Sequence, residues 1–169
     1  HDRGLRDDTA ALAAGTNQFK VNPERLRQEW KRSEWMRDNV LIAVAGGSGD
    51  GTSGLQGDAS LSALRIEIER LSHIIFSSQP KQREFWLGQG AVTAEVLKER
   101  WGGLRPCLHG SDAHSLDSVG APDLDRLCWV KGDLIFETLR QVCLEPETRV
   151  FIGDKAPRGA QPSQVISSM

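Results

Sequence analysis

The chain has 169 residues, with 21 lysines and arginines against 23 aspartates and glutamates, which gives a formal net charge of −2 at pH 7. This length suits one domain with a proper core. No run approaches the roughly 20 apolar residues of a membrane-spanning helix, and the near-neutral balance gives no large basic surface for nucleic acid.

The cysteines are few and widely spaced, at Cys107, Cys128 and Cys143. This pattern excludes a disulfide scaffold and favours a reducing compartment, so we predict a cytoplasmic protein. The sequence begins at His1 rather than at a methionine, and no signal-peptide pattern follows. We therefore expect the chain to be a piece of something longer.

The first 45 residues predict two helices and a strand. A small-residue run near the start favours a short helix, and a clearer helix begins at the capping residue Asn22 and continues to Asp38. Leu26 and Trp30, one turn apart, form its inward stripe. The continuous apolar run of residues 40–45 predicts a buried strand of a parallel α/β sheet.

A glycine-rich loop at residues 46–57 leads into three predicted helices. The first carries an apolar face packed on a sheet, formed by Leu61, Leu64, Ile68, Leu71 and Ile75. His73 lies off that stripe, which favours a position on the helix surface. A shorter amphipathic segment opens at Pro80, and residues 93–101 predict a helix that ends at Gly102-Gly103.

The remaining elements are shorter. Strands are predicted at residues 106–109, 127–130 and 149–152, with a helix at 134–144 that Asp133 caps and that stops at Pro146. The alternation of strands and helices indicates an α/β fold. We place one domain at residues 1–157 and a linker or frayed tail at 158–169.

The sharpest chemical signal is an Asp-x-His pair, Asp112 and His114, directly after a predicted strand. A carboxylate oxygen and an imidazole nitrogen together suit a divalent transition metal. Sites of parallel α/β folds gather beyond the carboxyl ends of the strands. The alternative is a turn in which Asp112 caps backbone amides and His114 is a surface residue.

The segment that carries this pair resembles the last metal-binding motif of PHP-domain (polymerase and histidinol phosphatase) phosphoesterases. The resemblance begins with PCLHGSDAH at residues 106–114. Further segments resemble the PHP module of the narrower TrlF-like group, in which a PHP domain is fused to an ATPase: RLCWVKGD at 126–133, FETLR at 136–140, EPETRV at 145–150, DGTSGLQ at 50–56 and REFWLG at 83–88. The resemblance covers roughly residues 38–157.

This resemblance implies the C-terminal portion of a distorted (β/α)7 PHP-type barrel that holds divalent metal ions at the carboxyl ends of its strands. Asp112 and His114 would be metal ligands, and Mn, Zn or Fe would suit them. The implied activity is metal-dependent hydrolysis of a phosphate ester. The implied partners are a phosphate-ester substrate and an ATPase domain of the same longer chain, with nucleic acid as a further candidate and no membrane.

The family's opening His-x-His motif is absent, since the four histidines are His1, His73, His109 and His114. A barrel of this kind needs about 200 to 250 residues. Two interpretations stay open: the first part of the barrel lies upstream, or the site has degenerated and the domain is a non-catalytic regulatory or docking module for an ATPase or nucleic acid. His1 and Asp2 are either a ligand pair or a disordered end.

Two more residues are candidates for binding substrate. His109 either orients Asp112 or contacts phosphate, although a hydrogen-bonded core histidine is the favoured interpretation. Lys131 shares a strand face with Trp129 and either neutralises a substrate phosphate or is a solvated strand-end lysine. The glycine-rich loop is not a P-loop, because Thr52 stands where the lysine must be; its amides remain candidate phosphate contacts.

Overall fold

The computed structural model describes residues 8–18, 22–46 and 62–159. The chain divides into two compact units, residues 1–40 and 41–169. No helix among the described residues is both long enough and apolar enough to cross a membrane.

The first unit contains three helices, α1 (Asp8–Gln18), α2 (Pro23–Arg32) and α3 (Glu34–Asn39). The predicted cap is confirmed: the Asn22 side chain accepts the backbone N–H groups of Glu24 and Arg25 at 2.9 and 3.2 Å. The prediction of one continuous helix to Asp38 is wrong. Ser33 is extended, and its hydroxyl accepts the Met36 N–H at 3.2 Å, so that it ends α2 and begins α3.

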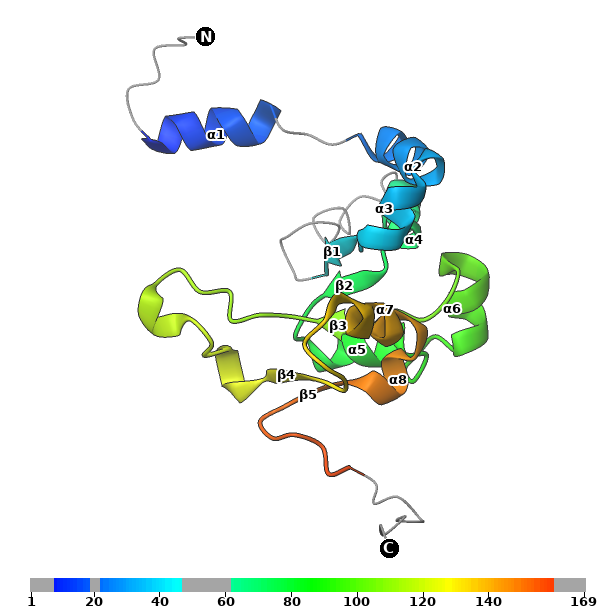
Figure 1. The fold of residues 1–169 in the computed structure, drawn as a ribbon, viewed down its shortest axis with the longest axis vertical. Helices are drawn as coiled ribbons and strands as arrows, with labels where there is room; N and C mark the ends of the chain where they lie inside the picture. Colours follow the sequence, from blue (N-terminus) through cyan, green and yellow to red (C-terminus); the bar gives the residue numbers. More distant parts are fainter. Residues whose placement is uncertain (1–7, 19–21, 47–61, 160–169) are drawn as a thin grey trace, which may run out of the picture. The chain divides into compact units, whose positions relative to one another are not determined.

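The second unit is built on a parallel sheet in the order β1-β2-β3 (Figure 1). Its strands are β1 (Ala43–Ala45), β2 (Ile74–Phe76) and β3 (Cys107–Leu108). Helix α4 (Ser62–Leu71) lies between the first two strands in the chain, and α5 (Pro80–Trp86) and α6 (Ala94–Trp101) lie between the second and third. Parallel strands need such crossovers, and the predicted α/β class is confirmed.

The strand β2 corrects the sequence prediction in this region. Ile75 follows the helical spacing of the apolar stripe, but α4 ends at Leu71 and Ile75 lies in the centre of the sheet, 2% exposed. His73 is therefore not on a helix surface. Its Nδ1 accepts the Ile42 backbone N–H at 3.1 Å, and its own N–H donates to the Ile42 carbonyl at 2.8 Å.

The core lies between this sheet and its helices. It contains Ile75, Trp86, Leu97, Trp101 and Cys107. The rings of Phe85, Trp86 and Trp101 meet edge to face at centroid distances of 5.2 to 5.7 Å, an arrangement that aromatic quadrupoles favour. Gly102 ends α6 with a φ of +85°, as the predicted glycine stop requires.

A second, antiparallel pair of strands follows. Strand β4 (Leu127–Val130) confirms the predicted bounds and pairs with β5 (Val150–Gly153). Between them lie α7 (Phe136–Leu144) and α8 (Pro146–Arg149). Asp133 is not the cap of α7, because the helix begins only after the extended residue Ile135.

The five described strands therefore form a three-stranded parallel sheet and a two-stranded antiparallel ladder. Strands β4 and β5 pair with each other and are not part of the parallel sheet. In the ranges that the structure describes, no closed barrel wall is formed, so the α/β class is shown and a barrel is not.

Candidate functional site

Asp112 and His114 lie in a long segment that leaves the carboxyl end of β3. Figure 1 shows this segment, residues 109–126, as a protruding yellow-green excursion that contains the short helical turns Leu116–Ser118 and Asp123–Asp125. Both side chains are exposed. Asp112 has a φ of +51°, a left-handed conformation that aspartate tolerates better than most residues.

The loop around this pair is held by serine hydrogen bonds. The Gly120 N–H donates to the Ser111 hydroxyl at 3.3 Å, and the Ser118 hydroxyl donates to the Ser115 carbonyl at 2.9 Å. Neither the Asp112 carboxylate nor the His114 imidazole has a hydrogen-bond partner among the described residues. Of the alternative, the surface position of His114 is present, whereas Asp112 caps no backbone amide among the described residues.

The two side chains are donors of the right type for a divalent metal, but two protein ligands are fewer than a metal site needs. Carboxylate and imidazole are donors that manganese, zinc and iron accept, but catalytic zinc, for example, takes three protein ligands. Within residues 8–18, 22–46 and 62–159, no group of three or more His, Cys, Asp or Glu side chains is placed to hold a metal ion. The described residues therefore contribute two candidate ligands.

His109 lies at the end of β3, where it contacts the next element rather than a cavity. Its Nε2–H donates to the Arg126 carbonyl, and its backbone N–H lies against the Cys128 sulfur. Nδ1 is buried and has no partner among the described residues. In the neutral tautomer that this bond selects, Nδ1 is an acceptor, which does not suit a phosphate oxygen. The hydrogen bond of the favoured interpretation is present, but His109 is half-buried and is not part of the core.

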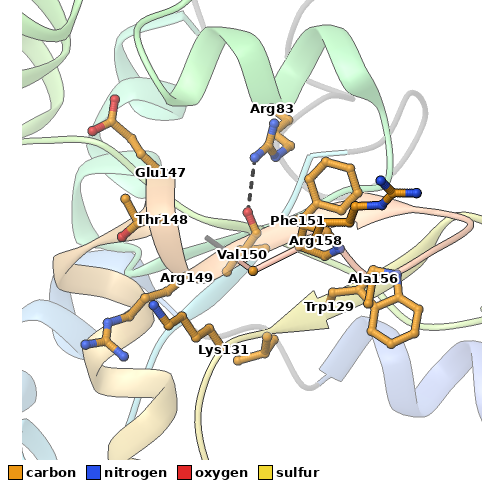
Figure 2. A pocket seen from close by; sticks show the side chains of 13 residues that line it. Arg83, Trp129, Lys131, Glu147, Thr148, Arg149, Val150, Phe151, Ala156 and Arg158 are labelled. Carbon is orange, nitrogen blue, oxygen red and sulfur yellow. Dashed lines mark hydrogen bonds between the residues drawn. The ribbon is translucent and has the colours of Figure 1, made fainter. Parts of the chain in front are cut away.

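Lys131 lines a pocket of about 460 Å³ at the far end of β4 (Figure 2). Trp129 and Val130 line the same pocket. The lining comes from α5, both antiparallel strands, α8 and the segment after β5, and consists of Arg83, 129–131, 147–151 and 156–159. Lys131 and Arg149 are neighbours, because the Lys131 N–H donates to the Arg149 carbonyl at 2.9 Å.

Arg83 enters this pocket from helix α5. Its Nη2 donates to the Val150 carbonyl at 3.0 Å, drawn as the dashed line in Figure 2. Its guanidinium carbon lies 5.9 Å from the centroid of the Phe151 ring, within cation–π range. Sequence reasoning did not assign Arg83 to a site, and no local signal could have done so, because it meets Val150 across 67 positions of the chain.

The two substrate-binding candidates do not share one site. His109 contacts the Arg126 carbonyl just before β4 begins, whereas Lys131 follows the end of that strand. Arg126 and Lys131 are five residues apart along an extended chain, which at ~3.3 Å per residue separates them by roughly 16 Å. The loop that carries Asp112 and His114 leaves from the His109 end of this region, between β3 and β4 (Figure 1).

Two predicted features lie on residues that the structure does not describe. The pair His1 and Asp2 lies outside the described ranges, as does the glycine-rich loop beyond Gly46. Gly46 itself continues the sheet edge, since its N–H donates to the Phe76 carbonyl at 3.0 Å.

Comparison of this chain with family models, with curated proteins and with solved structures finds no match. A function is therefore inferred from the residues of the chain and their geometry.

Proposed function

We propose that this chain is part of a metal-dependent phosphoesterase in which Asp112 and His114 supply two of the metal ligands. The observation that carries the proposal is their position: they follow the carboxyl end of β3 in a parallel α/β sheet. This is the edge at which sites of such sheets gather. Exposure of both side chains leaves them accessible to a metal ion and to substrate.

The chain's own residues would act here by binding and positioning. The left-handed backbone at Asp112 turns the chain between the two candidate ligands, and the Ser111 and Ser115 hydrogen bonds restrain the loop on either side of them. A bound divalent metal supplies a water of lowered pKa and polarises a phosphoryl oxygen. Further ligands would come from outside the described residues. The resemblance to the PHP–ATPase group extends the proposal to an ATPase-linked cytoplasmic protein. Its substrate would be nucleic acid, a nucleotide or another phosphate ester.

The proposal is tested by metal content and by phosphodiesterase activity of the full-length protein. We expect Asp112→Ala and His114→Ala each to lower Mn²⁺ affinity about tenfold or more in titration calorimetry and to lower hydrolysis of bis(p-nitrophenyl) phosphate in parallel. Asp117→Ala is the matched control, because Asp117 is exposed in the same loop. Wild-type metal content and activity in both ligand variants would refute the assignment.

The second candidate is a non-catalytic module that docks an ATPase or nucleic acid. It is favoured by the lack of a third ligand near the pair in the part of the chain that the structure describes. Large exposed apolar side chains on the same excursion, Leu116, Val119 and Leu124, add to it. Full-length protein that binds no Mn²⁺, and that stays inactive at every metal concentration, would favour this module over the enzyme.

A further inference from the structure

We propose that the pocket between the β4–β5 ladder and α5 binds a nucleoside 5′-phosphate. This site is separate from the Asp112 and His114 loop and does not depend on the phosphoesterase proposal. Its volume of about 460 Å³ lies within the range of small-molecule sites.

The charge of the lining favours an anion. Four cationic side chains line the pocket, Arg83, Lys131, Arg149 and Arg158, against the single carboxylate of Glu147. The whole chain carries a formal charge of −2, so the positive charge is a local property of this pocket. Concentrated charge in a concave site raises the local concentration of an oppositely charged ligand.

Two of these cations are available to a ligand. In the described part of the chain, the Lys131 ammonium and the Arg158 guanidinium have no hydrogen-bond or ion-pair partner. Arg149 is engaged at Nε by the Glu145 carboxylate at 2.7 Å. Figure 2 shows Lys131 and Arg158 on different sides of the pocket. An anion bound against either side chain would accept a charge-assisted hydrogen bond that the side chain does not make without it.

Arg83 is held in place before any ligand binds. Its bond to the Val150 carbonyl uses one of five guanidinium N–H donors, and the Phe151 ring lies beside it. A guanidinium fixed in this way loses little freedom when it donates to a phosphate oxygen.

The aromatic lining distinguishes a nucleotide from a simple phosphate. Trp129 is half-buried, and its indole N–H donates to the Gly153 carbonyl at 3.0 Å, which fixes the ring at the pocket wall. Phe151 also lines the pocket and is 38% exposed. Any nucleobase can stack on such rings, because every base has a flat π-face. A ligand with a base and a phosphate therefore uses both the aromatic and the cationic side chains of the pocket.

The test is titration calorimetry of the whole chain with AMP, ribose 5-phosphate and adenosine. We expect AMP to bind saturably and about tenfold more tightly than either fragment, because each fragment lacks one half of the complementary chemistry. Lys131→Ala and Arg158→Ala should each raise the Kd for AMP about tenfold. Added salt should weaken AMP binding in the wild type.

Matched controls separate this site from its surroundings. Lys155→Ala removes an exposed lysine that does not line the pocket and should leave the Kd for AMP unchanged. Asp117→Ala, an exposed carboxylate in the loop after β3 that does not line the pocket, should also leave it unchanged. The proposal is overturned if AMP fails to bind saturably, if AMP binds no more tightly than ribose 5-phosphate, if the two pocket variants keep wild-type affinity, or if a single-stranded oligonucleotide binds where AMP does not.

Discussion

Glu69 is a charged residue in the interior, 3% exposed, on the inner face of α4. Its carboxylate accepts the Trp101 indole N–H at 2.9 Å and pairs with the Arg65 guanidinium at 2.7 Å. Because burying an unpartnered carboxylate costs several kcal/mol, these two donors are what makes the position tolerable. They also tie α4 to α6 at one specific geometry.

Replacing the Trp101 indole with a ring that has no N–H donor tests how far the buried Glu69 carboxylate depends on this hydrogen bond. We expect Trp101→Phe to lower the free energy of unfolding by about 2 kcal/mol or more, since the buried carboxylate loses a hydrogen bond and the core loses volume. Trp35→Phe is the control, because Trp35 is 67% exposed, and should change stability by less than about 0.5 kcal/mol. Urea unfolding measures both, and equal losses would contradict the assigned role.

At the scale of the element, the start of α7 depends on a close approach of the backbone to the helix. Gly132 has a φ of +149°, and a Cβ there would lie 2.6 Å from Cγ2 and 2.7 Å from Oγ1 of Thr138. Thr138 is buried in the first turn and β-branched, so it cannot move aside cheaply. The turn before α7 is therefore specified by this glycine and not by Asp133.

Adding a methyl group at Gly132 should lower stability more than adding one at Gly120, a glycine in a turn with free space around it. Gly132→Ala combines backbone strain with overpacking, each of about 1–3 kcal/mol. Gly120→Ala, with a φ of +77° and no atom within 4 Å of the new Cβ, should lose only about 1–2 kcal/mol from its backbone conformation. Thermal unfolding of the two variants side by side measures the difference, and a smaller loss for Gly132→Ala would refute the close packing.

At the scale of the whole molecule, one small network joins the elements of the second unit. The Arg105 side chain donates to the Ser72 carbonyl at 2.7 Å and to the Trp101 carbonyl at 2.8 Å, beyond the end of α4 and at the end of α6. His73 joins the entry of β1 to that of β2 through Ile42. Burial, and then the charge of Arg105, lower the pKa of His73 below its ordinary value of 6.5.

This lowered pKa predicts a loss of stability in mild acid. Well above pH 6.5, His73 is neutral both in the folded and in the unfolded chain and contributes no pH dependence. As the pH falls below 6.5, the unfolded chain takes up a proton that the folded chain resists, so the free energy of unfolding decreases until the folded pKa is passed. A protonated Nδ1 also cannot accept the Ile42 N–H.

His73→Asn should flatten this profile, because an amide oxygen can accept the same N–H and does not titrate. Urea unfolding at pH 7.5, 6.5 and 5.5 measures the slopes. His114→Asn is the matched control, since His114 is exposed, and should keep the slope of the wild type. Parallel profiles for the wild type and His73→Asn would show that another group carries the pH dependence.

Local signals in the sequence predicted several elements well. The Asn22 cap, the helix between Thr93 and Gly102 and the strand β4 are as expected, because caps, left-handed glycines and period-two patterns act within a few residues. The placement of Asp112 and His114 after a strand also followed from the sequence. Their surroundings did not, because a ligand set is assembled from distant segments.

The sequence by itself determined the α/β class, the ends of several helices and the absence of a disulfide framework. Only the tertiary structure decided that Ile75 belongs to a strand. Ile75 lies four residues after Leu71, which continues the helical spacing, and an apolar residue at this position suits a helix or a buried strand equally well until the sheet forms. The tertiary structure also decided that β4 and β5 pair antiparallel and that Arg83 joins Lys131 in one cationic pocket. Those features depend on contacts between segments tens of residues apart. A local pattern of residues does not specify which distant segment packs against it.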